Sequence, residues 1–397
     1  MKVLCVNAGS SSLKFQLYEM PAEISVIGGY VEKIGAPDSF YTIKHEGKKT
    51  EVKKEIKDHA AAVKIMLEEL VNYGAVKDLN EIRAVGHRVV HGGEKYADSV
   101  IITDEVMKDI KEFTKFAPLH HPGNIAGIKA MEEALPEAVQ VAVFDTAFHQ
   151  TIPKVQYMYP VPMEWYKKYG VRKYGFHGTS HKYITEVMQK KLGKENINLI
   201  VCHVGSGASI TAVKEGKSYD TTMGLTPLDG LMMGTRSGSI DPSIVKYMID
   251  ESGMTYAEID TALNKQSGLL GICGHNDNRD VENAIKEGDE DARLALDMYV
   301  DRIVRHIAEY YLELGGQVDA IAFTAGVLEN GAETRASIIK GLAPLGIKLN
   351  EEVNNAIAGF KEITSGIITA EDSTIPVYVE PTNEEVMIIR DAYKFCK

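Results

Sequence analysis

Two copies of one short pattern lie half a chain apart, and they constrain the fold more than any other feature. Residues 3–18 form an apolar run, a turn rich in glycine and serine, and a second apolar run, and residues 199–213 repeat this order. Short apolar runs joined by a glycine turn are typical of a β-hairpin. Gly9 and Gly205 occupy equivalent places, 196 positions apart in a chain of 397 residues. The spacing predicts two related halves that open with the same hairpin.

The turn of the first hairpin carries groups that suit phosphate oxygens. Asn7, Ser10, Ser12 and Lys14 supply amide, hydroxyl and ammonium groups, and Gly9 allows the backbone to bend sharply. The pattern is not a Walker loop, and a serine-rich turn is more often only a solvated turn. The second copy favours the functional interpretation, because two such turns facing each other could hold a polyphosphate between domains.

Length, charge and cysteine content limit the class of protein. A chain of 397 residues is too long for one compact core, so we expect two domains. Its 44 Lys and Arg against 56 Asp and Glu give a formal charge of −12, which argues against a nucleic-acid or membrane partner. The four cysteines form no CxxC pair and read as reduced thiols. The apolar run before Gly9 is too short for a signal-peptide core and no run approaches the length of a membrane span, so we expect a cytoplasmic protein.

Arg88 and Asp145 stand at the ends of predicted strands. Arg88 lies within the apolar run 82–93, where a buried guanidinium needs a partner. It is either half of a structural ion pair or a clamp for an anion, and the sequence leaves both open. Asp145 follows the predicted strand 139–144, where ligands gather in α/β sheets, although it could equally cap a helix.

Two glycine-rich loops carry further candidates. His177 and His181 lie in residues 174–181, before a predicted helix, and a histidine there has room to reach a ligand. Zinc is the competing role, but no third ligand stands at a usual spacing. Arg236 carries the positive charge of the long loop 224–238, and its apolar neighbours argue against disorder. It is therefore a second candidate anion clamp.

Periodic patterns mark the main helices. Asp58 can cap a helix that ends before Gly74, and residues 291–314 carry the strongest helical stripe. Residues 318–323 form a strand that leads into the small-residue turn 324–330, a common nucleotide contact. A closing helix follows at 386–395.

Six motifs together resemble the acetate kinase family, within the acetate and propionate kinase group of the actin, Hsp70 and sugar-kinase superfamily. The resemblance runs from Val3 to Arg390. The two hairpins alone would indicate only nucleotide binding, but six specific motifs in the right order make coincidence implausible. They are residues 7–14, 86–93, 144–149, 174–181, 224–238 and 381–385.

The resemblance implies an α/β fold of two duplicated domains of the actin, Hsp70 and sugar-kinase (ribonuclease H-like) type. Each domain would contain a mixed five-stranded sheet flanked by helices, with an active-site cleft between the domains. Residues 1–150 would form the N-terminal domain, joined by the C-terminal helix 385–397, and residues 151–384 would form the nucleotide-binding domain. The resemblance also implies a homodimer.

The implied reaction is reversible, direct in-line transfer of the γ-phosphate of ATP to acetate, which gives acetyl phosphate and ADP. Mg²⁺ would be the cofactor, with Mn²⁺ as an alternative. The residues suit this chemistry, because phosphoryl transfer needs positioning and positive charge around the equatorial oxygens. Acetate is already a carboxylate, so no general base is required.

The family's functional residues carry over to matching positions. Arg88 and Arg236 would bind the carboxylate and the transferring phosphoryl group, and His177 would hydrogen-bond that group in the transition state. Asp145 would orient Arg88 or the metal shell, and Asn7 and Glu384 would hold Mg²⁺. The acetate methyl pocket would consist of Val90, Leu119, Phe176 and Pro227. The nucleotide would be bound by Ser10, Ser12, Lys14, His203, Gly205, Ser206, Gly207, Asp277, Asn278, Arg279, Gly326, Val327 and Asn330.

The chain departs from the family pattern mainly on the nucleotide side. Ser206 replaces the usual Asn, Ser239 the usual Asp, Asn278 an apolar residue and Leu328 a glycine, while His121 replaces an Asn on the acyl side. We expect Asn278 and Leu328 to weaken discrimination of the base, so that GTP and ITP work within about tenfold of ATP.

Two alternatives remain open. A propionate or butyrate kinase would differ only in the room that the methyl pocket leaves, which sequence cannot measure. A nucleotide-switched binding protein of the Hsp70 or actin kind would share the hairpins but would have no reason to combine Arg88, Asp145, His177 and Arg236.

Overall fold

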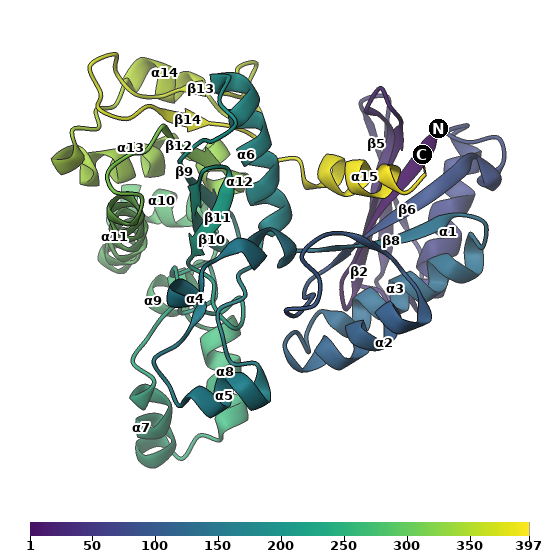
Figure 1. Cartoon of the computed structure of the whole chain (residues 1–397), viewed down its shortest axis with the longest axis horizontal. Coiled ribbons are helices and arrows are strands. Elements are labelled where there is room, and N and C mark those ends of the chain that lie inside the picture. Colours follow the sequence, from purple (N-terminus) through teal and green to yellow (C-terminus); the bar gives the residue numbers. More distant parts are fainter. Residues whose placement is uncertain (397) are drawn as a thin grey trace. The chain divides into compact units, whose positions relative to one another are not determined.

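The structure is a computed structural model that describes residues 1–396 and divides into two compact units (Figure 1). The first unit comprises Met1–Gln150 and the C-terminal segment from Asn383, and the second comprises Thr151–Thr382. The closing helix, α15, covers Glu384–Lys394, and the last residue of the predicted helix, Lys397, lies outside the described residues.

The first unit is built on a mixed sheet of eight strands in the order β5-β4-β3-β2-β1-β6-β8-β7. The hairpin β1–β2 is antiparallel, whereas β1, β6 and β8 run parallel to one another. The carboxyl ends of β1, β6 and β8 therefore meet at one edge of the sheet. The strands are β1 (Lys2–Ala8), β2 (Ser12–Glu19), β3 (Ile24–Glu32), β4 (Phe40–His45), β5 (Lys48–Lys53), β6 (Ile82–Val89), β7 (Val100–Ile101) and β8 (Val139–Phe144).

Helices cover both faces of this sheet. Val85 of β6 points into the core that α1 and α3 share, whereas a Cβ atom on the adjacent Gly86 would collide with Ile388 of α15. Because neighbouring residues of a strand point to opposite faces, α15 packs on the face opposite α1 and α3. Asp58 caps α1 as predicted, since its carboxylate accepts from the Ala61 amide at 2.8 Å. The helices are α1 (His59–Asn72), α2 (Asp104–Glu112), α3 (His121–Ala134) and α15.

The second unit contains a mixed sheet of six strands in the order β11-β10-β9-β12-β14-β13. The hairpin β9–β10 is antiparallel, and β9, β12 and β14 are parallel, as in the first sheet. The strands are β9 (Leu199–Val204), β10 (Ala208–Lys214), β11 (Lys217–Thr221), β12 (Ala320–Thr324), β13 (Gly366–Ile367) and β14 (Val377–Val379).

The longest helix of the second unit, α11, occurs where the apolar stripe predicted it, with α6 on the other side of the sheet (Figure 1). The helices are α4 (Lys154–Tyr157), α5 (Met163–Tyr169), α6 (Gly178–Leu192), α7 (Ser243–Ser252), α8 (Tyr256–Lys265), α9 (Gly268–Cys273), α10 (Asn278–Lys286), α11 (Glu290–Glu313), α12 (Ala325–Asn330), α13 (Ala332–Gly341) and α14 (Glu351–Ala356). Short 3₁₀ helices in the chain are η1 (Leu79–Glu81), η2 (Phe113–Lys115), η3 (Ala147–Thr151) and η4 (Ala343–Leu345).

Each sheet contains the same arrangement of five strands, which confirms the predicted duplicated α/β fold. The strands β3-β2-β1-β6-β8 and β11-β10-β9-β12-β14 have the same order and the same parallel and antiparallel pairings. The expectation of five strands per sheet is wrong. The hairpin β4–β5 and the short β7 extend the first sheet, and β13 extends the second, because each satisfies the backbone groups of an edge strand.

Within residues 1–396, no helix combines the length and the apolar character that a membrane span requires.

Candidate active site

The turn of the first hairpin is held from below by α3. The side chain of Asn124 donates to the Ala8 carbonyl at 2.7 Å and accepts from the Val90 amide at 3.2 Å. Gly123 lies so close to Gly9 that any Cβ atom there would overlap the turn's backbone. Asn124 and Gly123 thus fix the turn that carries Ser10 and Ser12, and Lys14 lies opposite Asn7 in the β1–β2 register.

Arg88 and Asp145 form a bidentate ion pair at the edge where β6 and β8 end. The Arg88 Nε lies 3.0 Å from Asp145 Oδ1, and Nη2 lies 2.6 Å from Oδ2. Asp145 is buried, and this carboxylate raises the pKa of Arg88 above its ordinary value. The pair rigidly orients the guanidinium, which keeps its remaining N–H groups for other acceptors.

Asn7 and Glu384 flank this pair in the first unit. Asn7 lies at the end of β1, the strand next to β6, and Glu384 begins α15, which packs over β1, β6 and β8. Burial raises the pKa of Glu384 to about 7, against the opposing effect of Arg88. An amide oxygen and a carboxylate are hard donors of the kind Mg²⁺ takes, and a cation would favour the ionised form of this carboxyl. The residues present therefore fit the expected cofactor.

Val90 and Leu119, the expected acyl-pocket residues of this unit, differ in exposure. Val90 is buried directly after β6, whereas Leu119 is exposed in the loop before α3. His121 supports the loop that follows Val90. Its Nδ1 donates to the Ile110 carbonyl at 2.8 Å, so Nε2 is free to accept from the His91 amide at 3.2 Å. Burial lowers the pKa of His121, which fits this neutral form.

In the second unit, His177 stands at the start of α6 in a left-handed backbone conformation, with φ of 55°. Its Nδ1 contacts the Ser209 hydroxyl at 2.8 Å, which His181 Nε2 also contacts at 2.8 Å. The ring lies 4.2 Å from that of His203. A positive φ outside glycine costs energy and is typical of functional sites. Among residues 1–396, no group of three or more His, Cys, Asp or Glu is arranged to hold a metal ion.

Arg236 lies beside His177 at the turn of the second hairpin. A Cβ atom on Gly207 would lie 3.3 Å from His177 Nε2 and 3.5 Å from Arg236 Nη1. Arg236 donates to the Pro227 carbonyl at 3.1 Å, and the described residues place no carboxylate within ion-pair distance of it. Burial without such a partner lowers the pKa of Arg236. The turn thus carries an uncompensated positive charge, which is what an anionic ligand requires.

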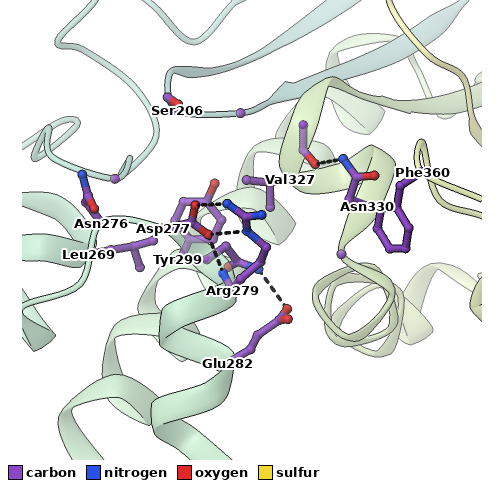
Figure 2. A pocket seen from close by; sticks show the side chains of 15 residues that line it. Ser206, Leu269, Asn276, Asp277, Arg279, Glu282, Tyr299, Val327, Asn330 and Phe360 are labelled. Carbon is purple, nitrogen blue, oxygen red and sulfur yellow. Dashed lines mark hydrogen bonds and ion pairs between the residues drawn. The ribbon is translucent and has the colours of Figure 1, made fainter. Parts of the chain in front are cut away.

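A pocket of about 530 Å³ extends from the same turn. Ser206 stands at one end, Asp277 and Arg279 project from the α10 side, and Val327, Asn330 and Phe360 lie on the opposite side (Figure 2). Eight of the residues expected to bind the nucleotide line it: Gly205, Ser206, Asp277, Asn278, Arg279, Gly326, Val327 and Asn330. The lining residues are Gly205, Ser206, Gly234, Leu269, Asn276, Asp277, Asn278, Arg279, Glu282, Tyr299, Gly326, Val327, Asn330, Gly331 and Phe360.

Asp277 and Arg279 form a second bidentate pair on this pocket wall, with 3.0 Å from Nε to Oδ1 and 2.7 Å from Nη2 to Oδ2. Asp277 also caps α10 by accepting from the Arg279 amide. These hydrogen bonds lower the pKa of the carboxyl. The pair thus holds the guanidinium on the exposed rim of the pocket.

Asn278 is tied into the helices behind the pocket. Its Nδ2 donates to Glu282 Oε1 and to Thr334 Oγ1, both at 2.9 Å. Because a carboxylate only accepts, this bond fixes which end of the amide faces Glu282. The Oδ1 atom is buried and has no hydrogen-bond partner among the described residues.

One expectation about the departures is wrong. Leu328 was expected to weaken discrimination of the base, but its side chain is fully buried and does not line the pocket. On α12, the face that carries Val327 and Asn330 meets the pocket, and Leu328 points into the core. Ser239 is a support for the loop: its hydroxyl donates to Asp229 at 2.6 Å and accepts from the Gly230 amide at 2.9 Å.

Several residues at the site were missed by the sequence reasoning. Ser209, Asn124, Glu282 and Phe360 touch the predicted residues or line the pocket. Ser209 is within the second hairpin, so its place there was an available signal, whereas a lone Phe360 in a loop gives none. Phe176 is buried beside His177, and Pro227 contacts Arg236 through its carbonyl.

Comparisons with known proteins agree with this site. The model of the Acetokinase family matches residues 2–390. The acetate kinase of Bacillus subtilis (strain 168) is 51% identical over 399 residues, which cover 100% of both chains. The solved acetate kinase of Porphyromonas gingivalis has a TM-score of 0.94 at 43% identity over 100% of both chains. The solved propionate kinase of Francisella tularensis subsp. tularensis SCHU S4 has a TM-score of 0.93 at 43% identity over 99% of each chain.

The resemblance inferred from six motifs is therefore confirmed. The similarity extends over nearly the whole chain and includes both hairpins and every motif between them. The chain belongs to the Acetokinase family.

Proposed function

We propose that this chain catalyses the reversible transfer of the γ-phosphate of ATP to acetate, which gives acetyl phosphate and ADP. The observation that carries the proposal is the pair of His177 and Arg236 beside Gly207. A half-buried arginine without a carboxylate partner, next to a histidine and a glycine turn, suits a phosphoryl group in transfer.

The residues of both units have complementary roles in this proposal. Arg88, oriented by Asp145, binds the carboxylate of acetate through the N–H groups that the ion pair leaves available. Arg236 and His177 stabilise the charge that spreads over the equatorial oxygens of the phosphoryl group. The acetate oxygen attacks the γ-phosphorus in line as the bond to the ADP oxygen breaks. No proton has to be removed, because the acceptor is already ionised.

The donor would occupy the pocket that begins at Gly205 and Ser206, with its phosphates at the glycine turn. Ser10, Ser12 and Lys14 of the first hairpin would contribute further phosphate contacts, and His203 would support the second turn. Asn7 and Glu384 would hold Mg²⁺, or Mn²⁺ in its place, which supplies charge neutralisation on the phosphate oxygens.

Acetate is preferred to longer acids in this proposal because of the side chains assigned to the methyl. Val90 and Phe176 are buried and leave little freedom to adjust. One solved relative is a propionate kinase, so propionate transfer is the second candidate.

We further propose a homodimer in the cytoplasm. Support for the dimer comes from large apolar side chains that the second unit exposes on and beside α4, α5, α7 and α8, including Val155, Trp165, Tyr247 and Tyr256. A second copy of the chain would cover them.

Support for the cytoplasm comes from the four cysteines, all of which are free thiols.

The decisive experiment assays purified protein with ATP, GTP, ITP and pyrophosphate against acetate, propionate and butyrate, with hydroxylamine to trap the acyl phosphate. We expect acetyl hydroxamate with ATP and Mg²⁺, and the highest kcat/KM with acetate. A higher value with propionate would reassign the acceptor. No acyl phosphate from any acid would refute the proposal.

A further inference from the structure

Phe360 is a large apolar side chain that is exposed to solvent at the wall of the pocket. It is 76% exposed, although it lines the same space as Ser206 and Arg279 (Figure 2). An aromatic ring has two flat apolar faces. When a planar ligand stacks on one of them, that face of the ring and the contacting face of the ligand are both removed from water. The pocket therefore presents a platform on which a flat ring can lie.

The backbone that carries Phe360 is anchored. Ile357 and Ala358, which precede it, are almost fully buried. The Lys361 amide donates to the Ala358 carbonyl at 2.9 Å, which closes a tight turn with Phe360 in its centre. The Lys361 Nζ donates to the Asn355 carbonyl at 2.6 Å. The exposed ring thus stands on a fixed turn, which reduces the entropy lost when a ligand binds to it.

Asn330 ties this turn to the phosphate end of the pocket. Its Oδ1 accepts from the Gly359 amide at 2.9 Å, and its Nδ2 donates to the Gly326 carbonyl at 2.9 Å. The amide N–H can only donate and the carbonyl can only accept, so both ends of this side chain are assigned. Both polar atoms of Asn330 therefore make hydrogen bonds to protein, and these bonds fix the orientation of its side chain.

The two ends of the pocket call for one kind of molecule. Gly205, Ser206 and Gly326 form a glycine-rich end suited to phosphate, and a Cβ atom on Gly205 would lie 3.7 Å from the Gly326 nitrogen. The other end presents Phe360 and, on the opposite wall, the flat guanidinium of Arg279. A molecule with phosphates at one end and an aromatic base at the other matches both.

We propose that Phe360 stacks on the base of the donor nucleotide and that Asn330 is a positioning residue that holds Phe360 in place. The inference rests on the proposed function, since it assigns the donor to this pocket. Every base has a π face, so stacking on Phe360 contributes affinity without selecting the base.

Phe360→Ala tests the platform by calorimetry with ADP and GDP. Stacking is lost, so the Kd of both nucleotides rises by about tenfold, which corresponds to about 1.4 kcal/mol. In turnover assays, the KM for ATP rises more than kcat falls. Thermal unfolding serves as the folding control and stays at the wild-type temperature, because the ring is exposed. An unchanged Kd for ADP refutes the stacking role.

Asn330→Ala tests the positioning role in a double-mutant cycle. Alone it raises the Kd for ADP by an amount similar to Phe360→Ala, because the ring loses its support. In the Phe360→Ala background it has no further effect. Full additivity of the two changes shows that Asn330 does not act through Phe360.

Phe360→Trp gives a spectroscopic readout that is independent of activity. Trp165 is the chain's only tryptophan, so its signal can be subtracted. ADP quenches the new emission, and the matched control Leu312→Trp, at a position 75% exposed on α11, shows no change. If ADP quenches neither tryptophan while calorimetry still shows that it binds, the inference is overturned and the proposed function stands. Failure of the wild-type protein to bind ADP overturns both.

Discussion

Arg236→Met separates the contribution of an arginine to catalysis from its contribution to stability. The substitution keeps an unbranched apolar stem and removes the charge, together with the hydrogen bond from Arg236 Nη1 to the Met233 sulfur. The folded protein pays for desolvating this guanidinium without a carboxylate to offset the penalty, as the lowered pKa indicates. We therefore expect lower activity and equal or higher stability in one variant.

The magnitudes follow from the contacts. Loss of a group that stabilises transferring phosphoryl charge costs about 10³-fold in kcat, within the range for such donors and for arginine fingers. For stability, loss of the hydrogen bond to the Pro227 carbonyl costs about 1 kcal/mol. Relief of the desolvation penalty offsets this, so the net change is between about 0 and 2 kcal/mol in favour of the variant.

The assay combines hydroxamate trapping of the acyl phosphate with thermal and urea unfolding. Arg305→Met is the matched control, because Arg305 is exposed on α11 and, among the described residues, its ion pair is with Asp301 one turn away. It should change neither quantity measurably. Activity of Arg236→Met within about tenfold of wild type would remove Arg236 from the mechanism. A loss of stability above about 2 kcal/mol would show that the charge is compensated in the folded protein.

Three further outcomes are expected. Arg88→Met should also abolish most activity, but it leaves the buried Asp145 carboxylate unpaired and should destabilise the protein by about 3 to 5 kcal/mol; unchanged urea unfolding would contradict this. Val90→Ala should raise the ratio of kcat/KM for propionate over acetate, because a methylene in such a pocket is worth about 1 to 3 kcal/mol; an unchanged ratio means that Val90 does not line it. Burial raises the pKa of Glu313 from 4.5 to about 7, and the negative charge of Asp220 contributes to this rise. The unfolded chain then loses this proton between about pH 4.5 and 7 while the folded chain keeps it, so stability falls as pH rises through that window. The free energy of unfolding of Glu313→Gln should therefore rise relative to wild type by about 1 to 2 kcal/mol between pH 4.5 and 7, a value reduced for the partial exposure of Glu313. A difference between the two proteins in urea unfolding that stays constant across that range would refute the assignment.

Much of the fold could be predicted because its signals are local. The hairpins at Gly9 and Gly205 are indicated by glycine-rich turns between short apolar runs. The cap at Asp58 is indicated by its residue type and place, and α11 by the spacing of its apolar residues. The strands that extend the sheets could not be predicted with the same ease. β7 and β13 are two residues long, too short for alternation to emerge, and they form only because a neighbouring edge offers hydrogen bonds.

The site divides in the same way. The sequence alone determined that the glycine turns, Arg88 and Arg236 belong to an anion-binding enzyme, since those residue types in those contexts resemble one family. Tertiary structure showed that Arg88 pairs with a carboxylate 57 residues away, whereas Arg236 meets none among the described residues. It also decided that Leu328 faces the core, that Asn330 holds a turn, and that Phe360 borders the pocket. The physical reason is that the charge state, burial and partners of a side chain depend on distances in space, which sequence spacing constrains only within a single helix, strand or turn.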